Sequence, residues 1–125
     1  MAYRITAQRV ERDQALREHI LDCAVQQVAD GGFSSLTMSV LARNAGIATG
    51  SLYRHFSGKG ELAAEVFVKA TRLELETLKQ QFQAKGRAVD RLRNGLTQFA
   101  ARAWHSRQLA YALIAEPAEE EVETR

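Results

Sequence analysis

The spacing of the apolar residues is the feature that most constrains the fold of this chain. Between residues 14 and 29, Leu16, Ile20, Ala24 and Val28 recur every four positions and so share one face of an α-helix. Apolar residues three and four positions apart continue along the rest of the sequence, which has a single proline. No segment shows the alternation that is typical of a strand. The sequence therefore predicts an all-α fold.

Caps and helix-breaking residues divide this pattern into separate helices. The pair Gly31-Gly32 ends the first helix, and Thr37 and Ser57 are the predicted N-caps of two later ones. The basic lead-in to the first helix, with Arg4, Arg9 and Arg12, is either helix or a loose arm. The predicted helices span about 14–29, 38–45, 49–56, 57–85, 87–104 and 106–115.

The charges are unevenly distributed, although the net charge is only +2. Residues 31–60 contain Arg43, Arg54 and Lys59 and no acidic residue, whereas the last ten residues hold five glutamates and one arginine. A polyanion would be attracted to the first of these regions. Arg43 by itself is expected to be a solvated charge.

The two short helices at 38–45 and 49–56 have the form of a helix-turn-helix, with Gly46 in the turn. At 100° per residue, Leu52 and Phe56 fall together and would face the core with Ile47 from the turn. Val40 and Leu41 of the preceding helix are expected to be buried as well. The second helix is therefore predicted to present its other face to solvent or to DNA.

The outer face of that second helix is suited to the DNA major groove. Gly50 allows a close approach of the backbone, Thr49 can reach a base edge, and Tyr53 can contact a phosphate or a thymine methyl. Arg54 lies on the same face. Lys59 lies in the first turn of the next helix, where free backbone N–H groups already attract phosphate. His55 is either a phosphate contact or a packed side chain.

Other features limit the remaining classes of function. The single cysteine, Cys23, cannot form an internal disulfide, and neither a secretory signal nor a membrane span is evident, which favours a cytoplasmic protein. The three histidines lack ligand partners at metal-binding spacing. The GKG at 58–60 lacks the earlier glycine, the following Ser or Thr and the preceding strand of a phosphate-binding loop. We therefore expect no enzyme, metal or cofactor.

The stretch LTMSVLARNAGIATGSLYRHFSGKGEL at 36–62 resembles the DNA-binding signature of the tetracycline-repressor (TetR) family of bacterial regulators. HILDCAVQQVADGGF at 19–33 is similar to the family's first helix. The resemblance implies a three-helix DNA-binding domain at 1–60, with 49–56 as recognition helix. Gly60 departs from the acidic or polar residue common at its position. A glycine there slightly weakens the start of the predicted helix at 57–85. The implied DNA-binding residues are Thr49, Gly50, Ser51, Tyr53, Arg54 and His55, with Thr37 and Lys59 on phosphates.

Residues 61–125 carry a weaker signal. The resemblance implies the first part of a helical domain for effector binding and dimerisation, and LAYALIAEP at 109–117 is similar to the sixth helix of some members. The family's later helices have no counterpart, so we expect a truncated product, a split gene or an incomplete chain. A complete protein would form a homodimer, and the 125-residue chain a non-standard oligomer. Aromatic residues could line an apolar effector pocket or belong to the core: Phe67, Phe82, Phe99, Trp104 and Tyr111.

The sequence thus predicts a cytoplasmic, nucleoid-associated transcriptional regulator. It would be a repressor that binds a double-stranded DNA operator and is released by a small-molecule effector of unknown identity. The alternative is a helical protein-interaction module whose basic face binds an acidic protein partner. Competition between DNAs of different sequence would separate the two hypotheses, because only the regulator distinguishes them.

Overall fold

The computed structural model describes residues 2–115, and the side chains of residues 6–115. That part of the chain is helical and contains no strand, so the predicted all-α fold is confirmed. None of its helices is long and apolar enough to cross a membrane. The elements are α1 (Ala2–Gly31), the 3-10 helix η1 (Phe33–Ser35), α2 (Met38–Ala45), α3 (Thr49–His55), α4 (Lys59–Phe82), α5 (Ala88–His105) and α6 (Arg107–Ile114).

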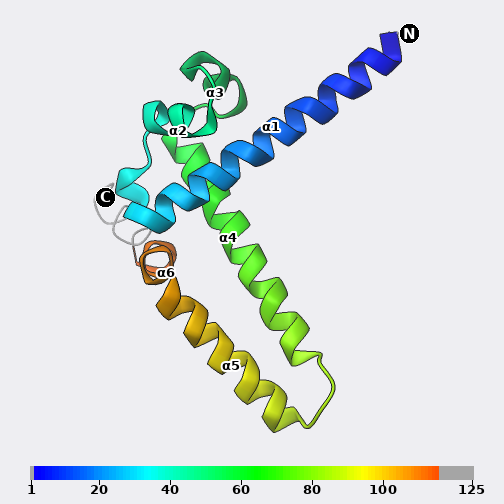
Figure 1. Cartoon of the computed structure of the whole chain (residues 1–125), viewed down its shortest axis with the longest axis vertical. Coiled ribbons are helices and arrows are strands. Elements are labelled where there is room, and N and C mark those ends of the chain that lie inside the picture. The colour runs from blue at the N-terminus through cyan, green and yellow to red at the C-terminus, as the bar shows by residue number, and fades with distance from the viewer. Residues whose placement is uncertain (1, 116–125) are drawn as a thin grey trace.

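Helix α1 is longer than the helix predicted at 14–29. It is continuous over 30 residues, so the basic lead-in is helix and not a loose arm. Figure 1 shows its N-terminal half projecting beyond the other helices. Residues 6–15 are exposed, whereas Ile20, Ala24 and Val28 of the apolar stripe are fully buried. Only the second half of α1 therefore supports the fold.

One hydrophobic core joins α1 to the helices that follow it. Val28 of α1, Leu52 of α3 and Val66 of α4 are all fully buried in this core, and α6 adds Ala112. Leu16 is only partly buried, at its edge. Because α4 buries Leu62 and Val66 there, the core continues past residue 60, where the sequence predicted a domain boundary. That boundary stays a prediction.

Two predicted caps have different outcomes. Thr37 is the N-cap of α2, since its hydroxyl accepts a hydrogen bond of 3.3 Å from the Val40 backbone N–H. Ser57 is not the N-cap of α4; Gly58 holds that position. Ser57 lies one residue too early, and its backbone N–H and hydroxyl instead donate to a carboxylate oxygen of Glu61, both at 2.7 Å.

The predicted burial of Val40 is wrong. Val40 is half-buried, because it lines a groove between α1 and α2.

Helices α4 and α5 form a long hairpin that extends away from the core, and α6 returns to pack against α1 (Figure 1). The two arms approach closely at Gly95, where a Cβ would lie 2.3 Å from the Phe82 ring. Arg102 of α5 donates from Nε to a Glu74 carboxylate oxygen of α4 at 3.0 Å. The hairpin therefore has its own contacts, although it leaves large apolar side chains exposed, among them Leu73, Leu75 and Leu92. Pro117 and the acidic tail lie outside the described residues.

Candidate nucleic-acid interface

The turn between α2 and α3 is set by Gly46. Its φ of 73° is left-handed, a conformation that glycine adopts without a steric penalty. The Gly46 N–H donates to the Arg43 carbonyl at 3.2 Å, and the Ile47 N–H donates to the Ala42 carbonyl at 3.0 Å. These two bonds close the end of α2 and redirect the chain into α3. The predicted helix-turn-helix is therefore formed.

Helix α3 has the two faces that the sequence predicted. Leu52 and the C-cap residue Phe56 are fully buried, and Ile47 from the turn is partly buried beside them. On the opposite side Thr49, Gly50 and Arg54 are exposed, and the Tyr53 side chain is 51% exposed. The side chains on the face that could contact DNA therefore do not pack in the core.

The remaining predicted residues of α3 lie at the border between these faces. Ser51 is half-buried, and its hydroxyl accepts a hydrogen bond of 3.0 Å from Arg54 Nη2. This bond holds the Arg54 guanidinium along the helix. His55 is also half-buried, and both of its predicted roles stay open.

Arg17 of α1 fixes the end of α3, a role that sequence analysis missed. Its Nη1 donates to the His55 backbone carbonyl at 2.6 Å, and its guanidinium lies over the Phe56 ring, 4.3 Å from the centroid. Its Nη2 pairs with a carboxylate oxygen of Glu65 in α4. Arg17 therefore ties α3 to both α1 and α4. These contacts span 38 and 48 residues, so no local pattern could have revealed them.

The two predicted phosphate contacts lie at the starts of neighbouring helices. Thr37 precedes α2 and is exposed. Lys59 is the first residue of α4 and is also exposed, so its ammonium is available to a polyanion. The nearby Glu61 carboxylate is occupied by Ser57, and these hydrogen bonds, the backbone one first, lower the pKa of Glu61.

This lowered pKa predicts a pH-dependent contribution of Glu61 to stability. A carboxylate whose folded-state pKa lies below its ordinary value of 4.5 stabilises the fold above that pH and loses the contribution as pH falls through the folded pKa. Glu61→Ala should therefore lower the urea midpoint at pH 7, and the difference from wild type should shrink by pH 3. Glu76→Ala, an exposed change in the same helix, is the matched control. A difference that is unchanged between the two pH values would contradict this role.

The aromatic residues predicted for an effector pocket do not lie in the core. Phe67 and Phe99 are each 38% exposed, Tyr111 is 57% exposed and Trp104 is 72% exposed; Phe82 is exposed as well. Core packing, the alternative that the sequence left open, is therefore wrong for this set. The effector pocket stays a prediction.

The helix-turn-helix region is similar to known bacterial regulatory proteins. Residues 20–66 match the family model described as bacterial regulatory proteins, tetR family. The HTH-type transcriptional regulator AcrR of Shigella flexneri is 33% identical over 72 residues, which are 58% of this chain and 33% of that protein. The HTH-type transcriptional repressor KstR2 of Mycolicibacterium smegmatis is 40% identical over 50 residues, which are 40% of this chain and 24% of that protein.

Solved structures show the same fold over more of the chain. A TetR family transcription regulator from Marinobacter aquaeolei matches with a TM-score of 0.68 and 22% identity, covering 82% of this chain and 54% of that one. A putative tetR family regulator from Shewanella sp. PV-4 matches with a TM-score of 0.62 and 23% identity, covering 80% and 54%. The matched region thus spans about a third or less of these two curated relatives and about half of the structural ones.

Proposed function

We propose that this chain is a TetR-family regulator and that it binds a specific double-stranded DNA operator with α3 in the major groove, which the match of residues 20–66 to the tetR family model supports. The observation that carries this proposal is the exposed face of α3. Thr49, Gly50, Tyr53 and Arg54 are exposed together, on a helix whose other face is buried. A rigidly held helix with polar and aromatic side chains on its free face is what base recognition in the major groove requires.

The contacts on this surface fall into two kinds. Thr49 and Arg54 carry groups that can hydrogen-bond base edges, and Gly50 has no side chain to keep the backbone away. Thr37 and Lys59, at the starts of α2 and α4, would bind phosphates and so fix the position of α3 on the duplex. The interval from 31 to 60 has no acidic residue that would repel the DNA backbone.

Release by a small molecule would act through α4. This helix begins at Lys59, beside the DNA-binding surface, and continues into the α4–α5 hairpin. Its Glu65 pairs with Arg17, which also holds the end of α3. An effector that favours a different position of α4 would therefore displace α3, and by linkage DNA would weaken effector binding by the same factor. We propose a repressor that acts as a homodimer on two operator half-sites.

The direct test is selection of bound sequences from random double-stranded DNA. The proposal expects enrichment of one motif, bound about 10³-fold or more tightly than random DNA at physiological salt. A helical module that binds an acidic protein would retain DNA only through charge and would enrich no sequence. Failure to enrich a motif would therefore reject the regulator and favour that alternative.

Lys59→Ala should weaken binding to all DNA sequences equally. Loss of one phosphate contact should also reduce the slope of log affinity against log salt by about one unit, since one counterion fewer is released. The measurement is fluorescence anisotropy titration at several salt concentrations, with selected and random duplexes. Lys79→Ala, an exposed lysine at the far end of the same helix, is the matched control and should change neither quantity. A change in sequence preference would show that Lys59 contacts bases.

A further inference from the structure

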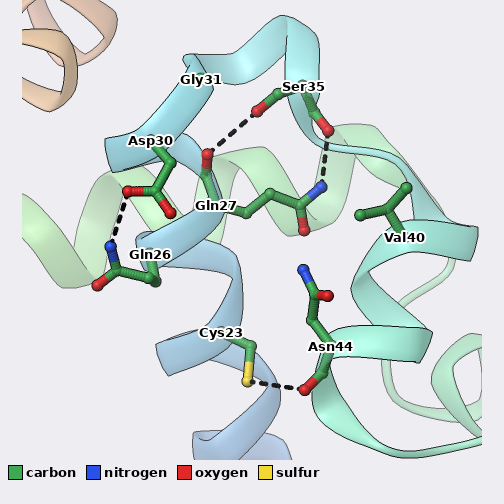
Figure 2. A pocket seen from close by; sticks show the side chains of 8 residues that line it. All are labelled: Cys23, Gln26, Gln27, Asp30, Gly31, Ser35, Val40 and Asn44. Atoms are coloured by element: carbon green, nitrogen blue, oxygen red, sulfur yellow. Dashed lines mark hydrogen bonds between the residues drawn. The ribbon is translucent and has the colours of Figure 1, made fainter.

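A groove of about 580 Å³ lies between α1, η1 and α2, in a part of the molecule that the proposed DNA contacts do not use. Figure 2 shows Cys23 and Gln27 of α1 on one side of it, and Val40 and Asn44 of α2 on the other. Its lining comes from residues that sequence analysis did not connect with binding. Space of this size accommodates a small organic molecule.

Gln27 gives the groove a specific polar requirement. Its side chain is 92% buried, since only 8% is exposed, and its Nε2 donates to the Ser35 backbone carbonyl at 2.6 Å. The Oε1 atom of the same amide is buried and has no hydrogen-bond partner among the described residues. Figure 2 shows this oxygen directed away from Ser35, into the space beside Val40 and Asn44. A buried acceptor without a donor costs free energy, which a bound donor would recover.

The groups around Oε1 define what kind of donor fits. The Asn44 carboxamide lies across from it in Figure 2 and can present either its N–H or its oxygen to an occupant. Val40 and Cys23 supply apolar surface, and the thiol makes only weak contacts, 4.0 Å to the Asn44 carbonyl and 3.9 Å to His19 Nε2. The Asp30 carboxylate, which accepts from Gln26 at 3.0 Å, lies on the rim and would repel an anion.

We propose that this groove binds a small neutral molecule with an apolar body and a hydroxyl group. The hydroxyl donates to Gln27 Oε1 and accepts from the Asn44 amide, while the apolar body packs against Val40 and Cys23. This site is separate from any effector pocket in the second half of the chain. Because its walls are α1 and α2, its occupant would contact the two helices that support α3.

The test uses phenol as the probe and Cys23 as the reporter. Cys23 is the only cysteine, is half-buried and lines the groove, so the rate of its alkylation by iodoacetamide measures access to the site. Phenol should slow this alkylation with an affinity on the order of millimolar. Anisole has the same ring but no donor, and it should need about tenfold higher concentration for equal protection, the effect of one hydrogen bond to a buried acceptor. The reaction of the reagent with free glutathione controls for effects on the chemistry.

Two variants make the result specific. Asn44→Ala removes an exposed side chain, so the fold is retained, and it should weaken protection by phenol more than protection by anisole. Gln27→Met removes the acceptor and should abolish the preference for phenol; circular dichroism verifies that it still folds. Equal protection by phenol and anisole, or no protection by either at concentrations on the order of tens of millimolar, would show that Gln27 Oε1 does not bind a hydroxyl group in this groove and would overturn the proposal.

Discussion

Replacing Phe56 with Ala is expected to lower the free energy of unfolding by about 3–5 kcal/mol. Phe56 is fully buried where α3 ends, and its ring packs in the core and lies beneath the Arg17 guanidinium. Truncation would leave a cavity at the point where α1, α3 and α4 meet, because the helices cannot fully close around it. Urea unfolding followed by circular dichroism measures the change.

Phe67→Ala is the matched control for this prediction. It makes the same chemical change in α4, but the Phe67 side chain is 38% exposed and lies outside the core. It should therefore cost clearly less than Phe56→Ala, since surface substitutions away from packed sites have small effects. Equal losses for the two variants would show that the core described around Phe56 does not determine stability.

Tyr53→Ala is expected to weaken operator binding by about 1–3 kcal/mol, which is about fivefold to 150-fold in affinity, with the fold intact. Tyr53 is 51% exposed on the free face of α3, so its removal leaves no cavity in the core. Its ring and hydroxyl would contact a thymine methyl and a phosphate, and both contacts would be lost. Fluorescence anisotropy with the selected operator measures the affinity, and thermal unfolding verifies the fold.

Two further variants assign the effect of Tyr53→Ala. Tyr53→Phe keeps the ring and removes the hydroxyl, so it separates the ring contact from the phosphate contact. Tyr111→Ala removes another exposed tyrosine, in α6 and far from α3 along the chain, and should leave operator affinity unchanged. Unchanged affinity in Tyr53→Ala would remove α3 as the recognition helix, whereas a loss in Tyr111→Ala would point to an indirect effect through folding.

The sequence predicted the helices and the two faces of α3 because both depend on residues close in the chain. Leu52 and Phe56 are four positions apart and therefore share a helix face, and Thr37 caps α2 through a bond that spans three residues. The turn at Gly46 likewise needs only a left-handed residue at the end of a helix. The local rule for N-caps failed at Ser57 by one position. The next residue, Gly58, is the N-cap of α4, and Ser57 donates hydrogen bonds to Glu61 instead.

Contacts between distant segments could not be predicted in this way. Nothing near Arg17 in the sequence shows that it will bind the His55 carbonyl and Glu65, because the packing angle of α1 against α3 and α4 decides which groups meet. The groove depends on the same packing: Gln27 is buried because η1 closes over the end of α1, and η1 itself was not predicted. The sequence by itself determined which faces of the helices are apolar and which face is free for DNA. Only the tertiary structure decided how α3 is held and where a buried acceptor is left without a donor, because both follow from the relative placement of whole helices.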